Sequence, residues 1–172
     1  MRPQLPGDLP VVERDVVRVV AQDAHGDVLL LRAQDRTEPG LGQWWELPGG
    51  GIEDGETYVE AAVRELREET GFVISADGVG PPTWRRIASF RYRGRRHLQH
   101  EVVVLACVDG TRPALDVRGR LHYEAEDYPD YCWCPVAELL ASDDRFYPGR
   151  LPALLPDLLA GRVVDEPFEL FS

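Results

Sequence analysis

The sequence has no long hydrophobic run. A helix that crosses a bilayer needs about 18 or more predominantly apolar residues, and no stretch of the 172 residues reaches that length. The N-terminal segment MRPQLPGDLP also lacks the apolar region of a secretory signal peptide. These two absences argue against a membrane-spanning or secreted protein, so a cytoplasmic location is the expectation.

Cysteine is scarce, and its spacing excludes two structural roles. The residues are Cys107, Cys132 and Cys134, an odd number in which a single residue separates the last two. Neither a disulfide framework nor the usual C-x-x-C zinc spacing matches this pattern. We therefore expect reduced cysteines in the core or on strands, since free cysteine is commonly buried.

Positive charge is also in deficit. The chain carries 30 Asp and Glu against 19 Lys and Arg, which gives a formal net charge of −11 at pH 7. Such a surface repels a polyanion, which argues against duplex nucleic acid as the main partner. A small phosphorylated molecule remains compatible, because a bound cation can reverse the local sign of a site.

The composition is that of one folded domain. With 44% hydrophobic residues, a chain of this length can build a full core. No repeat or linker divides it, and its mixture of helix-like and strand-like segments predicts an α/β domain over residues 14–172. Residues 1–13 hold three prolines and are predicted to form an extended N-terminal arm. Strands are expected at residues 16–20 and 28–31 as a hairpin, 44–47, from about 84, 99–108 and 131–134, a loop at 33–43, and further helices at 135–140 and 151–160, the last interrupted at Pro156.

The segment GGIEDGETYVEAAVRELREETGF, residues 50–72, carries the clearest helix signal. Thr57 and Glu60 have the spacing of a capping box, and Gly71 is the expected left-handed stop. Between these ends, apolar residues recur at i, i+3, i+4 and i+7, which predicts one buried stripe. The stripe consists of Val59, Ala62, Val63 and Leu66.

Three glutamates of this helix share another face. Glu65, Glu68 and Glu69 stand at i, i+3 and i+4. Like charges at this spacing weaken an isolated helix by roughly a few tenths of a kcal/mol per pair. A hard cation reverses the sign of that energy, and Mg²⁺ prefers oxygen ligands that substrate phosphates can complete. The alternative is an ordinary solvated surface with Arg64 and Arg67 as ion-pair partners.

The spacing of these residues resembles a family signature. Gly50 is followed after five residues by Glu56, and seven residues later comes the run Arg64-Glu65-Leu66-x-Glu68-Glu69-x-Gly71-Phe72. This pattern resembles the Nudix box, with every fixed position filled. Only Phe72 departs from the family's preference for an aliphatic residue, and a bulky apolar side chain can still pack there.

The resemblance implies a fold and a reaction. Nudix enzymes have an α/β/α sandwich around a mixed sheet, with a loop-helix-loop catalytic motif. They use Mg²⁺ or Mn²⁺ and hydrolyse the diphosphate linkage of nucleoside-diphosphate-X compounds by attack of a metal-activated water on phosphorus. The chain is therefore expected to be a diphosphate hydrolase whose partner is a small phosphorylated nucleotide.

The resemblance also implies roles for individual residues of the box. Glu65, Glu68 and Glu69 are expected to be metal ligands, one of them doubling as the general base. Arg64 is expected to orient a glutamate through a charge-assisted pair. Gly50 is expected to let the backbone approach the metal.

Other titratable residues are secondary candidates. Glu56 is expected to support the loop, or else to be a plain surface glutamate. Glu101 directly precedes the apolar run at 102–107, where the family often places a further catalytic and metal-binding acid; the alternative is a solvated strand end. His97 and His100 are interpreted as structural or exposed. A second acidic stretch offers weaker candidates for the base, namely Glu124, Glu126 and Asp127.

Arginines and tryptophans suggest contacts with the substrate. Six arginines crowd into residues 85–96. They indicate either a phosphate or ribose grip, with Arg91 and Arg93 as binding residues, or a charged hairpin tip. Trp44 and Trp45 alternate sides on a strand, so one of them, assigned as Trp45, is expected to stack on a base, unless both only pack in the core.

The group beyond the diphosphate stays open at this level. The ADP-ribose group of the family usually carries a proline where Ile87 stands, and the marks of the NADH, coenzyme A and dinucleoside-polyphosphate groups are missing. A nucleoside triphosphate, a nucleotide sugar or an ADP-ribose-like compound remains. A candidate from another class is a catalytically weak, nucleotide-binding sensor, although such modules usually have eroded boxes. The N-terminal arm could also exchange between the subunits of a homodimer.

Overall fold

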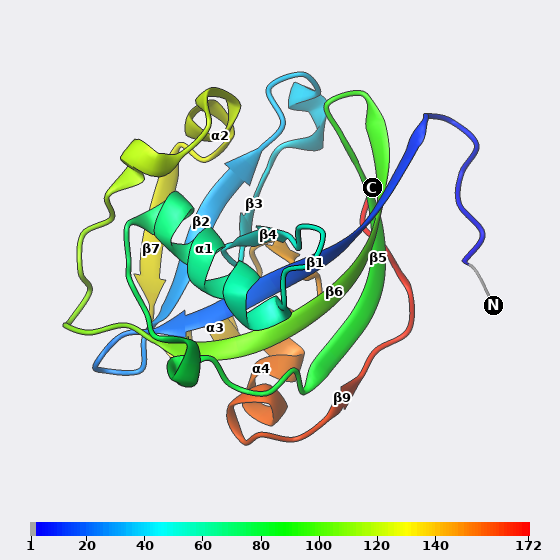
Figure 1. Ribbon diagram of the computed structural model, residues 1–172. Coiled ribbons are helices and arrows are strands. Elements are labelled where there is room, and N and C mark those ends of the chain that lie inside the picture. Colours follow the sequence, from blue (N-terminus) through cyan, green and yellow to red (C-terminus); the bar gives the residue numbers. More distant parts are fainter. Residues whose placement is uncertain (1–2) are drawn as a thin grey trace.

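The strands of the molecule form one curled, mixed sheet (Figure 1). The computed structural model describes residues 3–172, and within them the sheet has ten strands in the order β10-β5-β6-β1-β2-β3-β8, with β4 paired to β1, β7 to β2 and β9 to β5. The strands are β1 (Val11–Gln22), β2 (Val28–Gln34), β3 (Gln43–Glu46), β4 (Gly49–Gly51), β5 (Trp84–Tyr92), β6 (Arg95–Cys107), β7 (Asp130–Cys134), β8 (Phe146–Tyr147), β9 (Val164–Asp165) and β10 (Glu169–Leu170).

Strand β1 is the centre of this sheet. It pairs in parallel with β6 from Val11 to Gln22, and antiparallel with β2 and with the short strand β4. Val16 and Val17, which point to opposite faces, are both fully buried, as expected for a strand covered on both sides. The predicted hairpin of β1 and β2 is confirmed, and so is the central place of β6, which lies between β1 and β5.

Helices cover both faces of the sheet (Figure 1). Helix α1 (Tyr58–Thr70) packs on one face, in a cluster with Val17 and Val104. Helices α3 (Val136–Ala141) and α4 (Leu151–Leu159) pack on the other, in a cluster with Val20 and Val103. This arrangement confirms the predicted α/β/α sandwich. Within residues 3–172, no helix is both long and apolar enough to cross a membrane.

Several elements differ from the prediction. Strand β2 continues to Gln34, so part of the expected loop at 33–43 is strand, and a 3-10 turn follows at Pro39–Leu41. Helix α4 runs unbroken through Pro156, because burial of its leucines outweighs the hydrogen bond that proline cannot make. Helix α2 (His122–Asp127) was not predicted at all. Two further 3-10 turns lie at Ala76–Gly78 and Val117–Gly119.

The cysteines lie where the sequence suggested. Cys107 is on β6, while Cys132 and Cys134 are on β7. All three thiols are free; Cys107 is exposed, and the other two are half-buried. They are therefore strand residues without a disulfide partner.

The N-terminal segment is tied to the sheet by one arginine. The Arg96 side chain donates two hydrogen bonds to Asp8, and its backbone N–H donates to the carbonyl of Pro10. Strand β1 begins at Val11, inside the arm predicted for residues 1–13. Residues 1–2 of that arm lie outside the described residues.

Candidate functional site

The loop before α1 contains two glycines that leave no room for a side chain. A Cβ at Gly49, where φ is +143°, would lie 2.1 Å from the carbonyl oxygen of Val17. A Cβ at Gly50 would lie 2.5 Å from the carboxylate of Glu65. The backbone at Gly50 can therefore approach that carboxylate directly, which no other residue would allow.

Both predicted ends of α1 are present. The Thr57 hydroxyl accepts a hydrogen bond from the Glu60 N–H at 3.2 Å, and the Glu60 carboxylate accepts one from the Thr57 N–H at 2.8 Å. Gly71 closes the helix in the left-handed conformation, with φ +79°. In the predicted stripe, Ala62 and Leu66 are fully buried. Val59 and Val63 are half-buried. The helix is thus fixed in rotation about its axis.

That rotation turns the three glutamates toward a cavity, each with a different exposure. The Glu69 residue is only 3% exposed, and its carboxylate accepts a hydrogen bond from the Gly49 N–H at 2.8 Å. The side chain of Glu65 is 12% exposed and that of Glu68 is 45% exposed. All three line the same cavity. Their exposure to solvent increases from Glu69 through Glu65 to Glu68.

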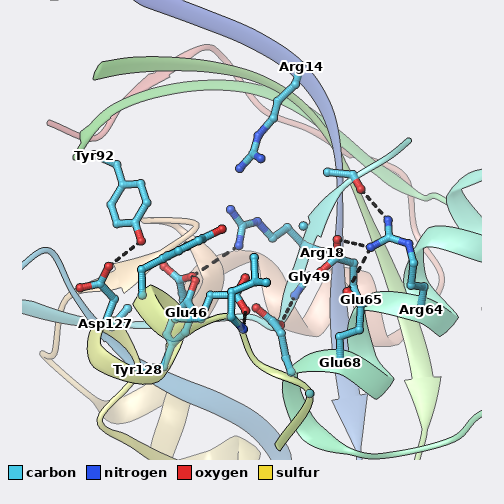
Figure 2. Close-up of a pocket in the computed structure, with 18 of the residues that line it drawn as sticks. Arg14, Arg18, Glu46, Gly49, Arg64, Glu65, Glu68, Tyr92, Asp127 and Tyr128 are labelled. Carbon is cyan, nitrogen blue, oxygen red and sulfur yellow. Dashed lines mark hydrogen bonds and ion pairs between the residues drawn. The ribbon is translucent and has the colours of Figure 1, made fainter. Parts of the chain in front are cut away.

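Arg64 joins this acidic face to the preceding loop (Figure 2). Its guanidinium makes two hydrogen bonds of 2.8 Å to the carboxylate of Glu56, one of 2.8 Å to Glu65, and one of 2.8 Å to the carbonyl of Gly51. It also lies 3.4 Å from Glu68. The guanidinium lowers the pKa of Glu56 by hydrogen bonding. Arg64 therefore holds loop and helix in one geometry.

Gly50→Ala is expected to lower kcat/KM roughly fivefold, or about 1 kcal/mol. The added Cβ must displace the Glu65 carboxylate, whose flexible end can shift without unfolding the helix. Steady-state kinetics and a thermal melt check this outcome.

Gly40→Ala is the matched control, because a Cβ there meets no atom within 4 Å. If the two alanine variants have the same kcat/KM, close approach at Gly50 has no role in the site.

The cavity beside α1 measures about 670 Å³. The box loop and α1 form one wall. The opposite wall contains Tyr92 of β5 and, from α2 and the residue after it, Asp127 and Tyr128. The Tyr92 hydroxyl donates to Asp127 at 2.6 Å. Figure 2 shows these two residues across the cavity from Glu65 and Glu68. The site therefore extends well beyond the box.

The floor of the cavity holds a buried carboxylate with three partners. Glu46, 7% exposed, accepts hydrogen bonds of 2.7 Å from the Tyr128 hydroxyl and from the indole N–H of Trp44. The Arg18 guanidinium lies 3.5 Å away. Burial raises the pKa of Tyr128 well above its usual range, so this phenol stays protonated and donates. The Glu46 carboxylate is thus held in place by three partners.

Residues 12–155 match the NUDIX domain family, a span that contains the box, helix α2 and strands β2 to β8. The chain belongs to the Nudix family. The loop-helix-loop and the cavity described above are thus parts of a Nudix domain.

Known relatives support the same assignment. The nucleoside triphosphatase NudI of Salmonella typhimurium is 29% identical over 134 residues, which cover 76% of this chain and 88% of the relative. The solved E. coli ORF135 protein has a TM-score of 0.55 at 25% identity, over 94% of this chain and 100% of its own. A Bacillus halodurans MutT protein has a TM-score of 0.59 at 20% identity, over 91% of this chain and 89% of its own, which shows the shared fold. The protein is a Nudix pyrophosphohydrolase.

The electrostatics of the Nudix helix favour a cation in the cavity. Burial raises the pKa of Glu65, and it raises that of Glu69 well above the ordinary 4.5. A carboxylate that has lost its water is charged at lower cost when a cation lies beside it. A cation bound beside these carboxylates would therefore lower the cost of charging them.

The possible ligands on α1, the helix of the Nudix box, are of the chemical type that a hard divalent cation prefers. Carboxylate oxygens are the ligands that Mg²⁺ and Mn²⁺ prefer, and the missing Cβ of Gly50 leaves Glu65 accessible. Within residues 3–172, no three His, Cys, Asp or Glu side chains are grouped as a metal site. The carboxylates instead have partners within the protein: Arg64 donates to Glu65 and Glu68, and the Gly49 N–H donates to Glu69.

The structure does not bring Glu101 together with the helix glutamates. Glu101 lies within β6, is 2% exposed, and does not line the cavity. Its carboxylate binds the Arg18 guanidinium at 3.2 Å, the Tyr147 hydroxyl at 2.8 Å, and Arg86. The alternative of a solvated strand end is wrong, since Glu101 is the centre of a buried ionic network.

The arginines and the tryptophan named as substrate contacts lie outside the cavity lining. Arg93 is paired with Asp127 at 2.7 Å, and Arg91 lies 3.5 Å from Glu38. Trp45 donates to Asp144 at 3.1 Å on the outer side of β3. Its neighbour Trp44, on the other side of the strand, lines the cavity.

The remaining candidates divide between the wall and the periphery. Glu124 lines the cavity with Asp127, whereas Glu126 pairs with Arg36 at 3.7 Å. His97 stacks on Phe90, and burial lowers its pKa to about 4. His100 lies 2.8 Å from Glu13. The histidines thus have structural or peripheral positions, as the sequence suggested.

Proposed function

We propose that this Nudix protein is a Mg²⁺- or Mn²⁺-dependent hydrolase that cleaves the diphosphate linkage of a nucleoside-diphosphate-X substrate. The observation that carries the proposal is the convergence of Glu65, Glu68 and Glu69 on one wall of a cavity, beside a glycine without room for a side chain. Diphosphate cleavage needs charge neutralised on phosphate oxygens and a water held in line.

The three glutamates would hold the cation through their carboxylate oxygens. A bound divalent ion supplies charge neutralisation of the phosphates and lowers the pKa of bound water. Arg64 keeps Glu65 directed at the cavity, and Glu56 fixes Arg64 through the paired hydrogen bonds. We propose a structural role for Glu101, since two arginines and a tyrosine already occupy its carboxylate.

The opposite wall is proposed to hold the nucleoside. Trp44, Phe90 and Tyr92 all line the cavity, and aromatic faces stack on bases. Asp127 is buried beside them, and Tyr92 and Arg93 share one of its carboxylate oxygens, Oδ2. Trp44 thus takes the stacking role that the sequence assigned to Trp45.

Mg²⁺ is expected to raise the melting temperature, and more at pH 8 than at pH 5. Because the folded-state pKa of Glu69 is raised, the charged carboxylate costs stability as the pH rises above about 4.5, and a cation offsets that cost. A cation at 100 times its Kd adds about 2.7 kcal/mol, or roughly 5–10 °C for a domain of this size. Differential scanning calorimetry measures the shift.

Glu69→Gln is the comparison for that melt, since it removes the charge and preserves the side-chain shape. The variant should show a clearly smaller Mg²⁺ shift at pH 8. Equal shifts in both proteins would place the cation elsewhere.

A substrate panel tests the function itself. Nucleoside triphosphates, nucleotide sugars, ADP-ribose and dinucleoside polyphosphates are incubated with and without Mg²⁺, and the products are identified by mass spectrometry. Hydrolysis of at least one class at a diphosphate linkage is expected. Binding without cleavage across the panel would favour the sensor alternative.

A further inference from the structure

Within residues 3–172, the cationic side chains that line the cavity are those of Arg14, Arg18 and Arg64. Two of them are already neutralised by carboxylates. Arg18 pairs with Glu101 at 3.2 Å and with Glu46 at 3.5 Å. The contacts of Arg64 with Glu56 and Glu65 are given above. The positive charge of each of these two guanidiniums is therefore already compensated by carboxylates of the protein.

Arg14 differs from both. Its side chain makes no hydrogen bond or ion pair with any residue in the described range 3–172, and the residue is exposed. Arg14 and Arg18 are four residues apart on β1, so their side chains leave the same face of the strand. Figure 2 shows the Arg14 guanidinium reaching into the cavity from above, with no partner drawn to it. It is an unpaired cation at the cavity mouth.

The Arg14 guanidinium lies beside the glycine loop that precedes α1. A Cβ at Gly51 would be 3.5 Å from an Nη of Arg14, and Gly51 directly follows Gly50, which contacts Glu65. Consecutive Cα atoms are about 3.8 Å apart. Arg14 is therefore placed one residue of backbone away from the acidic face that the diphosphate is proposed to approach.

The rest of the lining makes this cation significant. The remaining charged residues of the wall and floor are acidic. Glu46 and Asp127 are paired with arginines, whereas Glu53 and Glu124 have no ion-pair partner within residues 3–172. A phosphate group that extends past the diphosphate is repelled by unpaired carboxylates unless a cation lies beside it. A neutral sugar in the same place neither gains from Arg14 nor suffers that repulsion.

We propose that Arg14 binds a phosphate group beyond the diphosphate and makes the enzyme favour nucleoside triphosphates over nucleoside-diphosphate sugars. The inference rests on the proposed function, because the diphosphate must lie at the Nudix helix. A guanidinium suits this role, since it donates paired hydrogen bonds to phosphate oxygens.

The test compares substrates that share a nucleoside diphosphate and differ in the group beyond it. The pairs are ATP with ADP-glucose, GTP with GDP-mannose, and UTP with UDP-glucose. Arg14→Gln is expected to lower kcat/KM for the triphosphate at least about tenfold, or ~1.4 kcal/mol. The nucleotide sugar of the same pair should change less than about threefold, a loss below one kcal/mol.

Two further variants separate binding from other effects. Arg14→Lys keeps the charge and should recover part of the lost triphosphate activity. Arg162→Gln removes an exposed arginine that pairs with Asp157, away from the cavity, and should change neither substrate. Because the Arg14 side chain makes no hydrogen bond or ion pair within residues 3–172, Arg14→Gln should melt close to the wild-type temperature.

The outcomes are distinct. An equal loss for both members of a pair would show that Arg14 binds the shared diphosphate, and no loss for either would show that it binds no phosphate; both overturn the proposal. If the wild-type enzyme cleaves no pair, the full substrate panel decides the proposed function. Calorimetric binding of the same pairs then decides the role of Arg14: weaker binding of the triphosphate alone by Arg14→Gln supports it, and equal binding by both proteins overturns it.

Discussion

Glu69→Gln is expected to lower kcat at least tenfold while the protein stays folded. A tenfold loss corresponds to about 1.4 kcal/mol of barrier, and the effect extends to the several kcal/mol that a catalytic cation contributes. Glutamine keeps an oxygen that can accept the Gly49 N–H but removes the charge that a divalent ion requires. Because the Glu69 carboxylate is desolvated, losing its charge should not destabilise the fold.

The control for this variant is another Glu→Gln change outside the site. Glu138 is exposed on α3, and Glu138→Gln should retain wild-type kinetics. A near-wild-type kcat for Glu69→Gln, measured at saturating Mg²⁺ and substrate, would refute the ligand assignment. A collapse of its melting temperature would instead assign Glu69 to the core.

Glu101→Gln is expected to destabilise the protein by about 3–5 kcal/mol, because it leaves buried arginines without their counter-charge. The Glu101 side chain has no exposed surface and is shared by Arg18 and Arg86. For a domain of this size the melting temperature should fall by about 10 °C. Thermal and urea unfolding, followed by circular dichroism, measure the loss.

Tyr147→Phe provides the calibration for that result. It removes only the hydroxyl that donates to Glu101 at 2.8 Å, so the loss should be about 1 kcal/mol. If Glu101→Gln melts within about 2 °C of wild type, a shift worth less than 1 kcal/mol, yet loses turnover, then Glu101 acts in catalysis.

The local features of the Nudix helix could be predicted because neighbouring residues determine them. The capping box of Thr57 and Glu60, the stop at Gly71 and the acidic face all follow from a period of 3.6 residues. The family pattern suggested that Gly50 lets the backbone approach a metal, which stays a prediction; the structure shows that a Cβ there would meet the Glu65 carboxylate.

The opposite wall could not be predicted, because it is assembled from distant segments. Helix α2 has only six residues and no periodic pattern of apolar residues, so the sequence gives no signal for it. It nevertheless places Tyr128 next to Glu46, which is 82 residues away in the sequence. Glu101 looked like a strand-end acid because its burial depends on β1 and β5 pairing on either side of β6. Which of Trp44 and Trp45 faces the cavity depends on the face of β3 that the sheet turns inward.

Hydrolysis in ¹⁸O-labelled water, with and without Mg²⁺, tests the central claim most directly. The enzyme is incubated with the substrate of the panel that it hydrolyses fastest, and the incorporation of ¹⁸O into each product is measured by mass spectrometry. Water attack on phosphorus predicts one ¹⁸O atom in a phosphate-containing product, with Mg²⁺ and wild-type Glu69 both required. Product formation that is unchanged by chelation of divalent ions, or label found outside the phosphate groups, would contradict it.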